Sequence, residues 1–196
     1  MTDKQHITQV NNYYMLNGLH EAFGEDPEWI HVKRNQNTVA DQIINWGTKT
    51  GDFNTGCYSL NALKDIYEAR SFYSFKDENG QKQTIKIEKD HTVKTKTLAV
   101  EVWENMDNFS GPEDFISFLL ENVYILNMTR AENKHKDAKN ISEPIERYRA
   151  LGIDVVYKKV KNFQWSSIDS FESMLGNFEA IQLEEWLILA PLKDEV

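Results

Sequence analysis

The chain has 196 residues, of which 22 are Lys or Arg and 31 are Asp or Glu, so its formal net charge at pH 7 is −9. Hydrophobic residues make up 40% and charged residues 27%, which argues against the disordered and fibrous classes. No apolar run approaches the roughly 18–20 residues that span a bilayer, and the N-terminus lacks a signal-peptide layout. A lone Cys57 fits a reducing compartment, so we expect a cytoplasmic protein that does not enter a membrane.

The first half of the chain predicts three helices. Apolar residues recur at three- to four-residue steps between Ile7 and Phe23, and Gly24 is a natural stop. A capping-box pattern at Thr38 opens a short helix through Trp46. Apolar spacing over 60–67 marks another helix.

The connections between these helices carry weaker patterns. Residues 29–33 are typical of a short strand, and 35–37 of a turn. The glycine-rich stretch 47–56 lacks the lysine and spacing of a phosphate-binding loop, so we interpret it as an ordinary loop.

The middle of the chain predicts an antiparallel meander. Residues 71–75 alternate as a strand does, Asn79-Gly80 is a strong hairpin signal, and 83–88 forms the return strand. Alternating apolar residues over 92–103 predict a third strand with a bulge near Thr97.

The last third begins with a central amphipathic helix predicted over 112–128, because Pro112 suits a first turn and a wide apolar stripe follows it. Residues 129–142 are polar and predict a loop. A short helix at 144–151 and a strand at 153–160 come next. Residues 163–175 fit either a loop or a short helix. The run 178–189 is interpreted as a strand, with a helix as the alternative.

These elements define an α+β fold, in which an antiparallel sheet packs against the N-terminal helix and the central helix. No linker composition or internal repeat stands out, so residues 1–196 are predicted to form one domain, with 35–70 as an inserted region.

The charge alternates along the chain in blocks. The net charge is −4 for residues 1–80, +3 for 81–100, −6 for 101–128, +4 for 129–161 and −6 for 162–196. Blocks of both signs are typical of solvated faces, or of a protein whose faces bind copies of itself. The low pI of about 5.1 makes nucleic-acid binding the weaker interpretation.

Few residues suggest chemistry. The five histidines are far apart and are interpreted as ordinary surface or rim residues, and we expect no cofactor. A metal-dependent nuclease would need Glu88, Asp90 and Glu101 to meet on adjacent strands of the meander. Alternating acids and lysines on a half-exposed sheet face are the competing explanation.

The order of elements resembles that of tail-terminator and neck proteins at the head–tail junction of tailed bacteriophages. The likeness is carried by helix 7–23, strand 98–103, the loop and helix at 111–120, and the closing strands 153–160 and 178–189. It covers most of the chain as element order, without a diagnostic motif. The resemblance implies a small α+β subunit that assembles into a ring.

The sequence therefore predicts a non-enzymatic assembly protein, located in the host cytoplasm or the virion, whose partners are itself and other protein subunits. One alternative is an acidic inhibitor of a host nuclease or DNA-binding enzyme, and the other is the metal nuclease. The lysines predicted to contact a neighbouring subunit are Lys86, Lys94, Lys96, Lys158 and Lys159.

Overall fold

The computed structural model describes residues 2–24, 39–48, 53, 56–72, 74–76, 78–92, 95–135, 141, 144–159 and 163–182. The chain divides into two compact units. The first, which we call the helical unit, contains Met1–Asn54 and His91–Tyr124. The second, the sheet unit, contains Thr55–Asp90 and Ile125–Val196. The units are defined by the contacts inside each of them. The expectation that residues 1–196 form one domain therefore stays a prediction.

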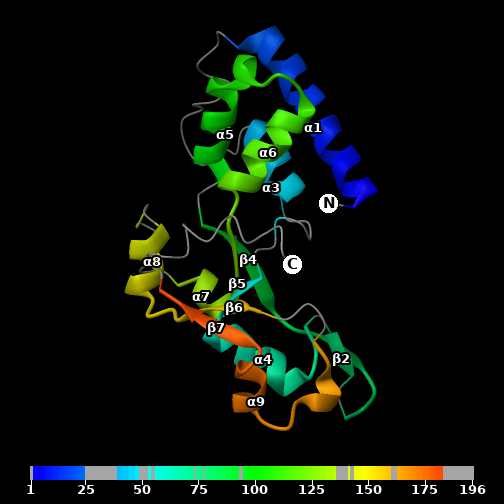
Figure 1. The fold of residues 1–196 in the computed structure, drawn as a ribbon, viewed down its shortest axis with the longest axis vertical. Coiled ribbons are helices and arrows are strands. Elements are labelled where there is room, and N and C mark those ends of the chain that lie inside the picture. Colours follow the sequence, from blue (N-terminus) through cyan, green and yellow to red (C-terminus); the bar gives the residue numbers. More distant parts are fainter. Residues whose placement is uncertain are drawn as a thin grey trace. The chain divides into compact units, whose positions relative to one another are not determined.

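The helical unit consists of four helices and a short 3₁₀ turn in the described residues (Figure 1). They are α1 (Asp3–Phe23), α3 (Val39–Thr48), α5 (Thr95–Glu104), the turn η2 (Met106–Asn108) and α6 (Pro112–Asn122). The helices predicted over 7–23 and 38–46 are confirmed by α1 and α3. The expected strand at 29–33 and turn at 35–37 lie outside the described residues.

Helix α1 packs against both α6 and α3, and α3 packs against α5. The α1–α3 contact is close because residue 47 is a glycine. The buried Gln9 side chain donates a hydrogen bond of 2.7 Å to the Gly47 carbonyl, and a Cβ at Gly47 would lie 2.6 Å from the Asn12 amide nitrogen. A larger residue at position 47 would therefore force the Asn12 and Gln9 side chains to move, and it would disturb the Gln9 hydrogen bond.

The strand predicted over 92–103 is wrong, because Thr95–Glu104 forms helix α5. Its buried residues are Leu98, Ala99, Val102 and Trp103, which follow helical spacing. Alternating Leu98, Val100 and Val102 imitated a strand, but Val100 is only half-buried. Packing on α3 has overridden the β-propensity of the valines.

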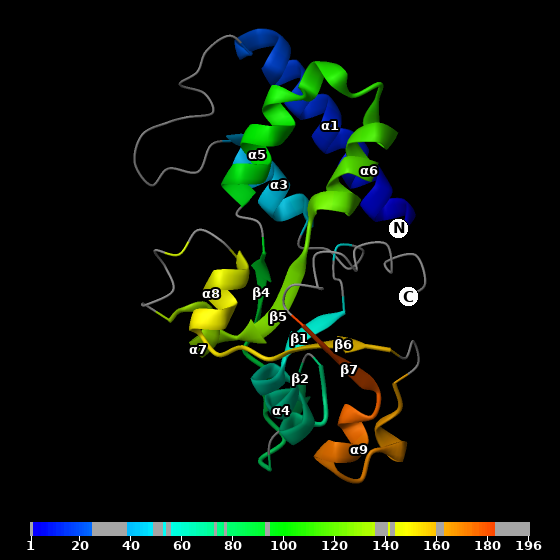
Figure 2. The ribbon, with the colours of Figure 1, turned by 60° about the vertical axis from the view of Figure 1, so that its left-hand side comes forward.

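The sheet unit is built on five strands in the order β4-β5-β1-β6-β7 (Figure 2). Their bounds are β1 (Cys57–Ser59), β4 (Ile87–His91), β5 (Ile125–Thr129), β6 (Val155–Lys158) and β7 (Phe178–Ile181). Strand β1 pairs parallel with β5 and antiparallel with β6, and β6 pairs antiparallel with β7.

Backbone hydrogen bonds at the two ends of β4 and β5 set their direction. The Thr92 N–H donates to the Tyr124 carbonyl, and the Arg130 N–H donates to the Lys86 carbonyl. The residue after the end of β4 thus pairs with the residue before the start of β5, and the residue before β4 pairs with the residue after the strand part of β5. This pairing makes β4 and β5 antiparallel.

Helices α4 (Leu60–Ala69) and α9 (Phe171–Leu175) contact this sheet. Their shared core contains the buried residues Leu63, Ile66, Val156, Ile168, Met174 and Phe178. The predicted helix at 60–67 is confirmed by α4. The open choice over 163–175 resolves into a 3₁₀ turn, η4 (Trp165–Ser167), followed by α9.

The predicted hairpin is confirmed. Strands β2 (Ser74–Lys76) and β3 (Lys82–Thr84) pair antiparallel, with Ser74 opposite Thr84. Gly80 in the turn has φ +74°, a left-handed conformation that glycine adopts without steric cost.

The helix predicted over 112–128 is correct to Asn122 and wrong beyond it, where β5 begins at Ile125. Strand β5 lies between β4 and β1, and its residues Ile125 to Met128 are all buried. A strand buried on both faces shows no alternation of exposed residues, and even Asn127 is buried, with its amide donating to the Cys57 carbonyl. The apolar residues of β5 therefore matched the end of a helical stripe.

The remaining elements are α7 (Arg130–Asn133) and α8 (Pro144–Ala150). The predicted loop at 129–142 thus contains a short helix, whereas the predicted helix at 144–151 and the strand at 153–160 are confirmed by α8 and β6. Strand β7 confirms the start of the run 178–189, and residues after 182 lie outside the described part.

The α+β class is confirmed, with a mostly antiparallel five-stranded sheet. The helices that contact the sheet within its own unit include α4, α7 and α9, whereas α1 and α6 pack against each other in the helical unit.

Substitution of Phe115 by Ala tests the core of the helical unit. The Phe115 side chain is fully buried, with its ring centroid 5.9 Å from that of Tyr13. We expect Phe115→Ala to lower the free energy of unfolding by about 3–5 kcal/mol in urea denaturation. The matched control Phe118→Ala removes a half-buried ring on the same helix and should cost less. Equal losses would contradict this burial pattern.

Candidate functional site

The three carboxylates of the nuclease hypothesis do not lie on adjacent strands. Glu88 and Asp90 lie on β4 in the sheet unit, whereas Glu101 lies on helix α5 of the helical unit. The adjacent-strand premise is therefore wrong, because it depended on a strand at 92–103. Within the described residues, no group of three His, Cys, Asp or Glu side chains is arranged to hold a metal ion.

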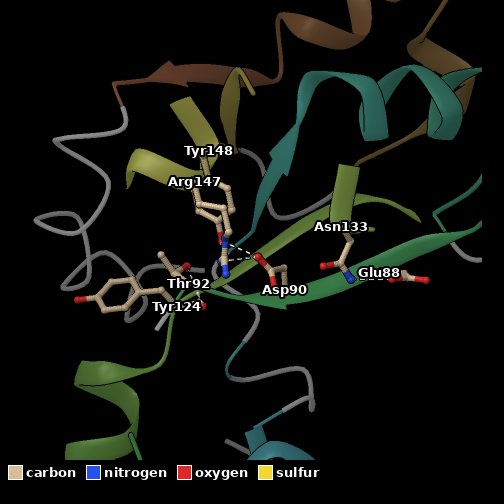
Figure 3. Close-up of polar contacts among 7 residues, drawn as sticks. All are labelled: Glu88, Asp90, Thr92, Tyr124, Asn133, Arg147 and Tyr148. Carbon is tan, nitrogen blue, oxygen red and sulfur yellow. Dashed lines mark hydrogen bonds and ion pairs between the residues drawn. The ribbon is translucent and has the colours of Figure 1, made fainter. Parts of the chain in front are cut away.

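Asp90 instead binds two side chains of helix α8 (Figure 3). Its Oδ2 atom accepts a hydrogen bond of 2.7 Å from the Arg147 guanidinium and one of 2.8 Å from the Tyr148 hydroxyl. Arg147 also donates to the Tyr148 oxygen at 3.0 Å. The ion pair is largely buried, since the side chains of Arg147 and Asp90 are 14% and 18% exposed.

Tyr148 is the buried anchor of this cluster, with 0% of its surface exposed. Burial, followed by the negative charge of Asp90, raises the pKa of Tyr148 far above its ordinary value. Its hydroxyl therefore stays protonated and donates to Asp90. Such a group holds a helix in place and does not act as a base near neutral pH.

A second set of contacts joins β4 to helix α7. The Asn133 side chain donates a hydrogen bond of 2.6 Å to Glu88, as Figure 3 shows. Arg130 lies 3.5 Å from the other oxygen of the Glu88 carboxylate. Both candidate nuclease acids of β4 are thus engaged by side chains of their own unit.

Glu132 organises the base of helix α7, and the sequence interpretation missed it. Its Oε2 atom accepts hydrogen bonds from the Thr129 backbone, the Thr129 hydroxyl and the Ser59 hydroxyl, and its Oε1 accepts one from Asn61. Thr129 and Glu132 form a capping box, whose Thr-x-x-Glu spacing is visible in the sequence. That signal would have predicted α7 inside the stretch assigned as a loop.

These side chains surround a pocket of about 180 Å³ in the sheet unit. It is lined by Asp90, Met128, Glu132, Asn133, His135, Arg147, Tyr148 and Leu151. The space suits a small polar molecule or water, and its walls carry two carboxylates, a guanidinium and an imidazole. The two carboxylates accept hydrogen bonds from this chain, so the arrangement favours a structural role over acid–base chemistry.

The structure corrects the interpretation of the histidines in one case. His91 is buried, and its Nε2 atom lies 2.8 Å from the Thr48 hydroxyl. The Thr48 hydroxyl also lies 2.7 Å from the Ile44 carbonyl, so it joins the His91 ring to the last turn of α3. His91 therefore holds the end of α3 and is no surface residue, whereas His31 lies outside the described residues.

The five predicted interface lysines differ in their surroundings. Lys86, Lys96 and Lys159 are exposed, and Lys94 lies outside the described residues. Lys158 is half-buried, with its ammonium 5.3 Å from the centroid of the Phe72 ring.

Partial burial lowers the pKa of Lys158. The Lys158 ammonium packs on the aromatic cluster of its own unit, where it also lies 5.9 Å from the Phe163 ring centroid.

An apolar groove lies between α1 and α3 of the helical unit, with a volume of about 540 Å³. It is lined by Thr8, Asn12, Met15, Val39, Gln42, Ile43, Trp46 and Gly47. Trp46 is 70% exposed, an unusual state for the largest apolar side chain. The sequence interpretation assigned these residues to helices and gave this surface no role.

Comparisons with protein-family models, curated proteins and solved structures found no match to this chain. None of the helices in the described part of the chain combines the length and apolar character that crossing a membrane requires.

Substitution of Asp90 tests the anchor of α8. We expect Asp90→Ala to lower the free energy of unfolding by about 2–4 kcal/mol, because Arg147 and the Tyr148 hydroxyl lose their shared acceptor. The control Glu146→Ala breaks the exposed Glu146–Arg149 pair on the same helix and should change stability by less than about 0.5 kcal/mol. Chemical denaturation measures the free energy of unfolding of both variants. If Asp90→Ala left this free energy unchanged, Asp90 would not be the anchor of α8.

Tyr148 also predicts a loss of stability at high pH. Its folded-state pKa lies above the ordinary value of 10.0, so the contribution is complete below pH 10 and is lost as pH rises toward the folded-state pKa. We expect this group to lower the free energy of unfolding by about 1.4 kcal/mol per pH unit above pH 10. Tyr148→Phe should remove that slope, whereas Tyr14→Phe, which changes a 61% exposed tyrosine, should preserve it. Parallel slopes in all three proteins would contradict the assignment.

Proposed function

We propose that the chain is a non-enzymatic structural protein that assembles with copies of itself into a ring. Such a ring is what the predicted resemblance to phage head–tail junction proteins implies, although the segment 98–103 that contributed to this resemblance as a strand is part of helix α5. One observation carries the proposal. Among the described residues, the exposed large apolar side chains all lie on α1 and α3, and they are Ile7, Tyr14, Met15, Phe23, Val39 and Trp46.

Leaving such side chains in water has a free-energy cost. Burying a Leu- or Phe-sized side chain contributes roughly 1.5–3 kcal/mol, so their clustering on two neighbouring helices favours association. Exposed aromatic residues are also enriched among the residues that dominate protein–protein binding energy. Tyr14 and Trp46, at 61% and 70% exposed, have this character.

The polar cluster of the sheet unit supports the non-enzymatic part of the proposal. Asp90 and Glu88 bind Arg147 and Asn133, and Glu132 caps α7. Acids that are held by their own chain stabilise elements of the fold, and a catalytic acid or base would need access to a substrate.

Charge adds a second, weaker contribution to assembly. Lys86, Lys96 and Lys159 are exposed and remain the predicted contacts with acidic surfaces of a neighbour. Surface ion pairs of this kind contribute about 0–1 kcal/mol and are screened by salt. They would guide subunits together, while the apolar surfaces hold them.

Light scattering coupled to gel filtration tests the proposal. We expect the mass of the particle to rise with protein concentration to a fixed oligomer. This oligomer should persist in about 1 M salt, where charges are screened beyond about 3 Å. Electron micrographs of the same sample should show rings. A monomer at every concentration and ionic strength would overturn self-assembly and leave the inhibitor hypothesis as the better explanation.

A further inference from the structure

Helix α1 carries a second exposed, uncharged surface besides the groove wall, with Ile7 and Tyr14 as its large apolar residues. Ile7, Asn11, Tyr14 and Gly18 follow each other at i, i+4, i+7 and i+11, and all four are exposed. Nothing lies within 4 Å of the position that a Gly18 Cβ would occupy. This spacing forms one stripe along a helix, which is the pattern of helices that dock into grooves. We call it the α1 stripe.

The α1 stripe and the groove occupy different sides of α1. Tyr14 belongs to the stripe and Met15 lines the groove, and consecutive residues of an α-helix point about 100° apart. Tyr14 and Trp46 both protrude into solvent, yet they belong to separate surfaces of one unit.

Both surfaces lack charge in an acidic chain. Helix α1 contains no Asp, Glu, Lys or Arg between Gln5 and His20, although 27% of the whole chain is charged. The groove lining contains no charged residue either. Two chains of net charge −9 repel each other, so they associate best where neither surface carries charge.

We propose that the α1 stripe of one copy docks into the α1–α3 groove of the next copy. The proposal rests on the proposed self-assembly and names the surfaces that carry it. Ile7 and Tyr14 of one subunit contact Met15, Val39 and Trp46 of its neighbour. Because the two surfaces differ, each subunit inserts its α1 stripe into one neighbour and receives the stripe of another neighbour in its groove. This is the head-to-tail type of contact that can close into rings.

The absence of charge in the groove favours a second copy of this chain as the molecule that binds there. A groove adapted to a basic partner would carry acids at its wall, and one adapted to an acidic partner would carry lysines. The wall has Thr8, Asn12 and Gln42 as its polar residues. An uncharged groove matches an uncharged helix stripe, and α1 supplies such a stripe on this chain.

Single substitutions test the contact in the full-length chain. Tyr14→Glu places a charge on the stripe, and Trp46→Glu places one in the groove. Each should weaken self-association roughly 10-fold or more in sedimentation velocity, since a desolvated unpaired charge costs more than about 1.4 kcal/mol. The control Ser117→Glu adds the same charge at an exposed position of α6 and should assemble like the unmodified chain.

Mixing the two variants identifies the head-to-tail arrangement. The Tyr14→Glu chain keeps an intact groove, and the Trp46→Glu chain keeps an intact stripe. We expect a 1:1 mixture to form a dimer that grows no further, whereas each variant alone stays monomeric. A contact through one self-complementary surface that contains both Tyr14 and Trp46 would place a glutamate in the contact on each chain, so the mixture would also stay monomeric. A contact between two stripes alone, or two grooves alone, would let one of the variants associate by itself.

The outcomes separate this inference from the proposed function. If the unmodified chain assembles and both glutamate variants assemble equally well, the docking surfaces are wrong and self-assembly stands. If the unmodified chain is monomeric throughout, both are wrong. Circular dichroism checks that the Trp46→Glu chain keeps its helices. If it does not, Thr8→Glu, at an exposed position of the groove wall, replaces it as the groove variant.

Discussion

The Asp90 carboxylate is the acceptor on which the attachment of helix α8 to the sheet depends. A tyrosine hydroxyl with no exposed surface and a mostly buried guanidinium both need a partner, and one oxygen atom serves the two. The position of α8 then determines one wall of the polar pocket. Glu132 has a similar role at α7. Its carboxylate accepts hydrogen bonds from Ser59 at the end of β1 and from Asn61 in the first turn of α4.

The two units use their polar and apolar groups in opposite ways. In the sheet unit, the acids of β4 and α7 bind donors of the same chain, so the strongest electrostatic interactions are internal. In the helical unit, α1 and α3 leave large apolar side chains in water, and α1 has no Asp, Glu, Lys or Arg between Gln5 and His20. The proposed self-assembly through the helical unit is based on this contrast, because water penalises exposed apolar surface and leaves satisfied ion pairs unchanged.

Elements with a local signal could be predicted from the sequence, because apolar residues at three- to four-residue steps, a capping residue or a turn residue mark them. Helices α1, α3 and α4 and the hairpin around Gly80 belong to this group. Two other elements were predicted wrongly, for different reasons. Strand β5 read as the end of a helix, because a central strand has no polar face to mark its period of two. Helix α5 read as a strand, because its valines imitate alternation.

The sequence by itself determined the acidic balance, the α+β class, the hairpin turn and the capping pattern at Thr129 and Glu132, because each depends on composition or on neighbours a few residues apart. Only the tertiary structure decided which distant side chains meet. It brought Asp90 to Tyr148, and it placed Glu88 on a strand of the sheet unit and Glu101 on a helix of the helical unit. It also left Trp46 exposed, since a helical apolar residue is buried or exposed according to what packs against it.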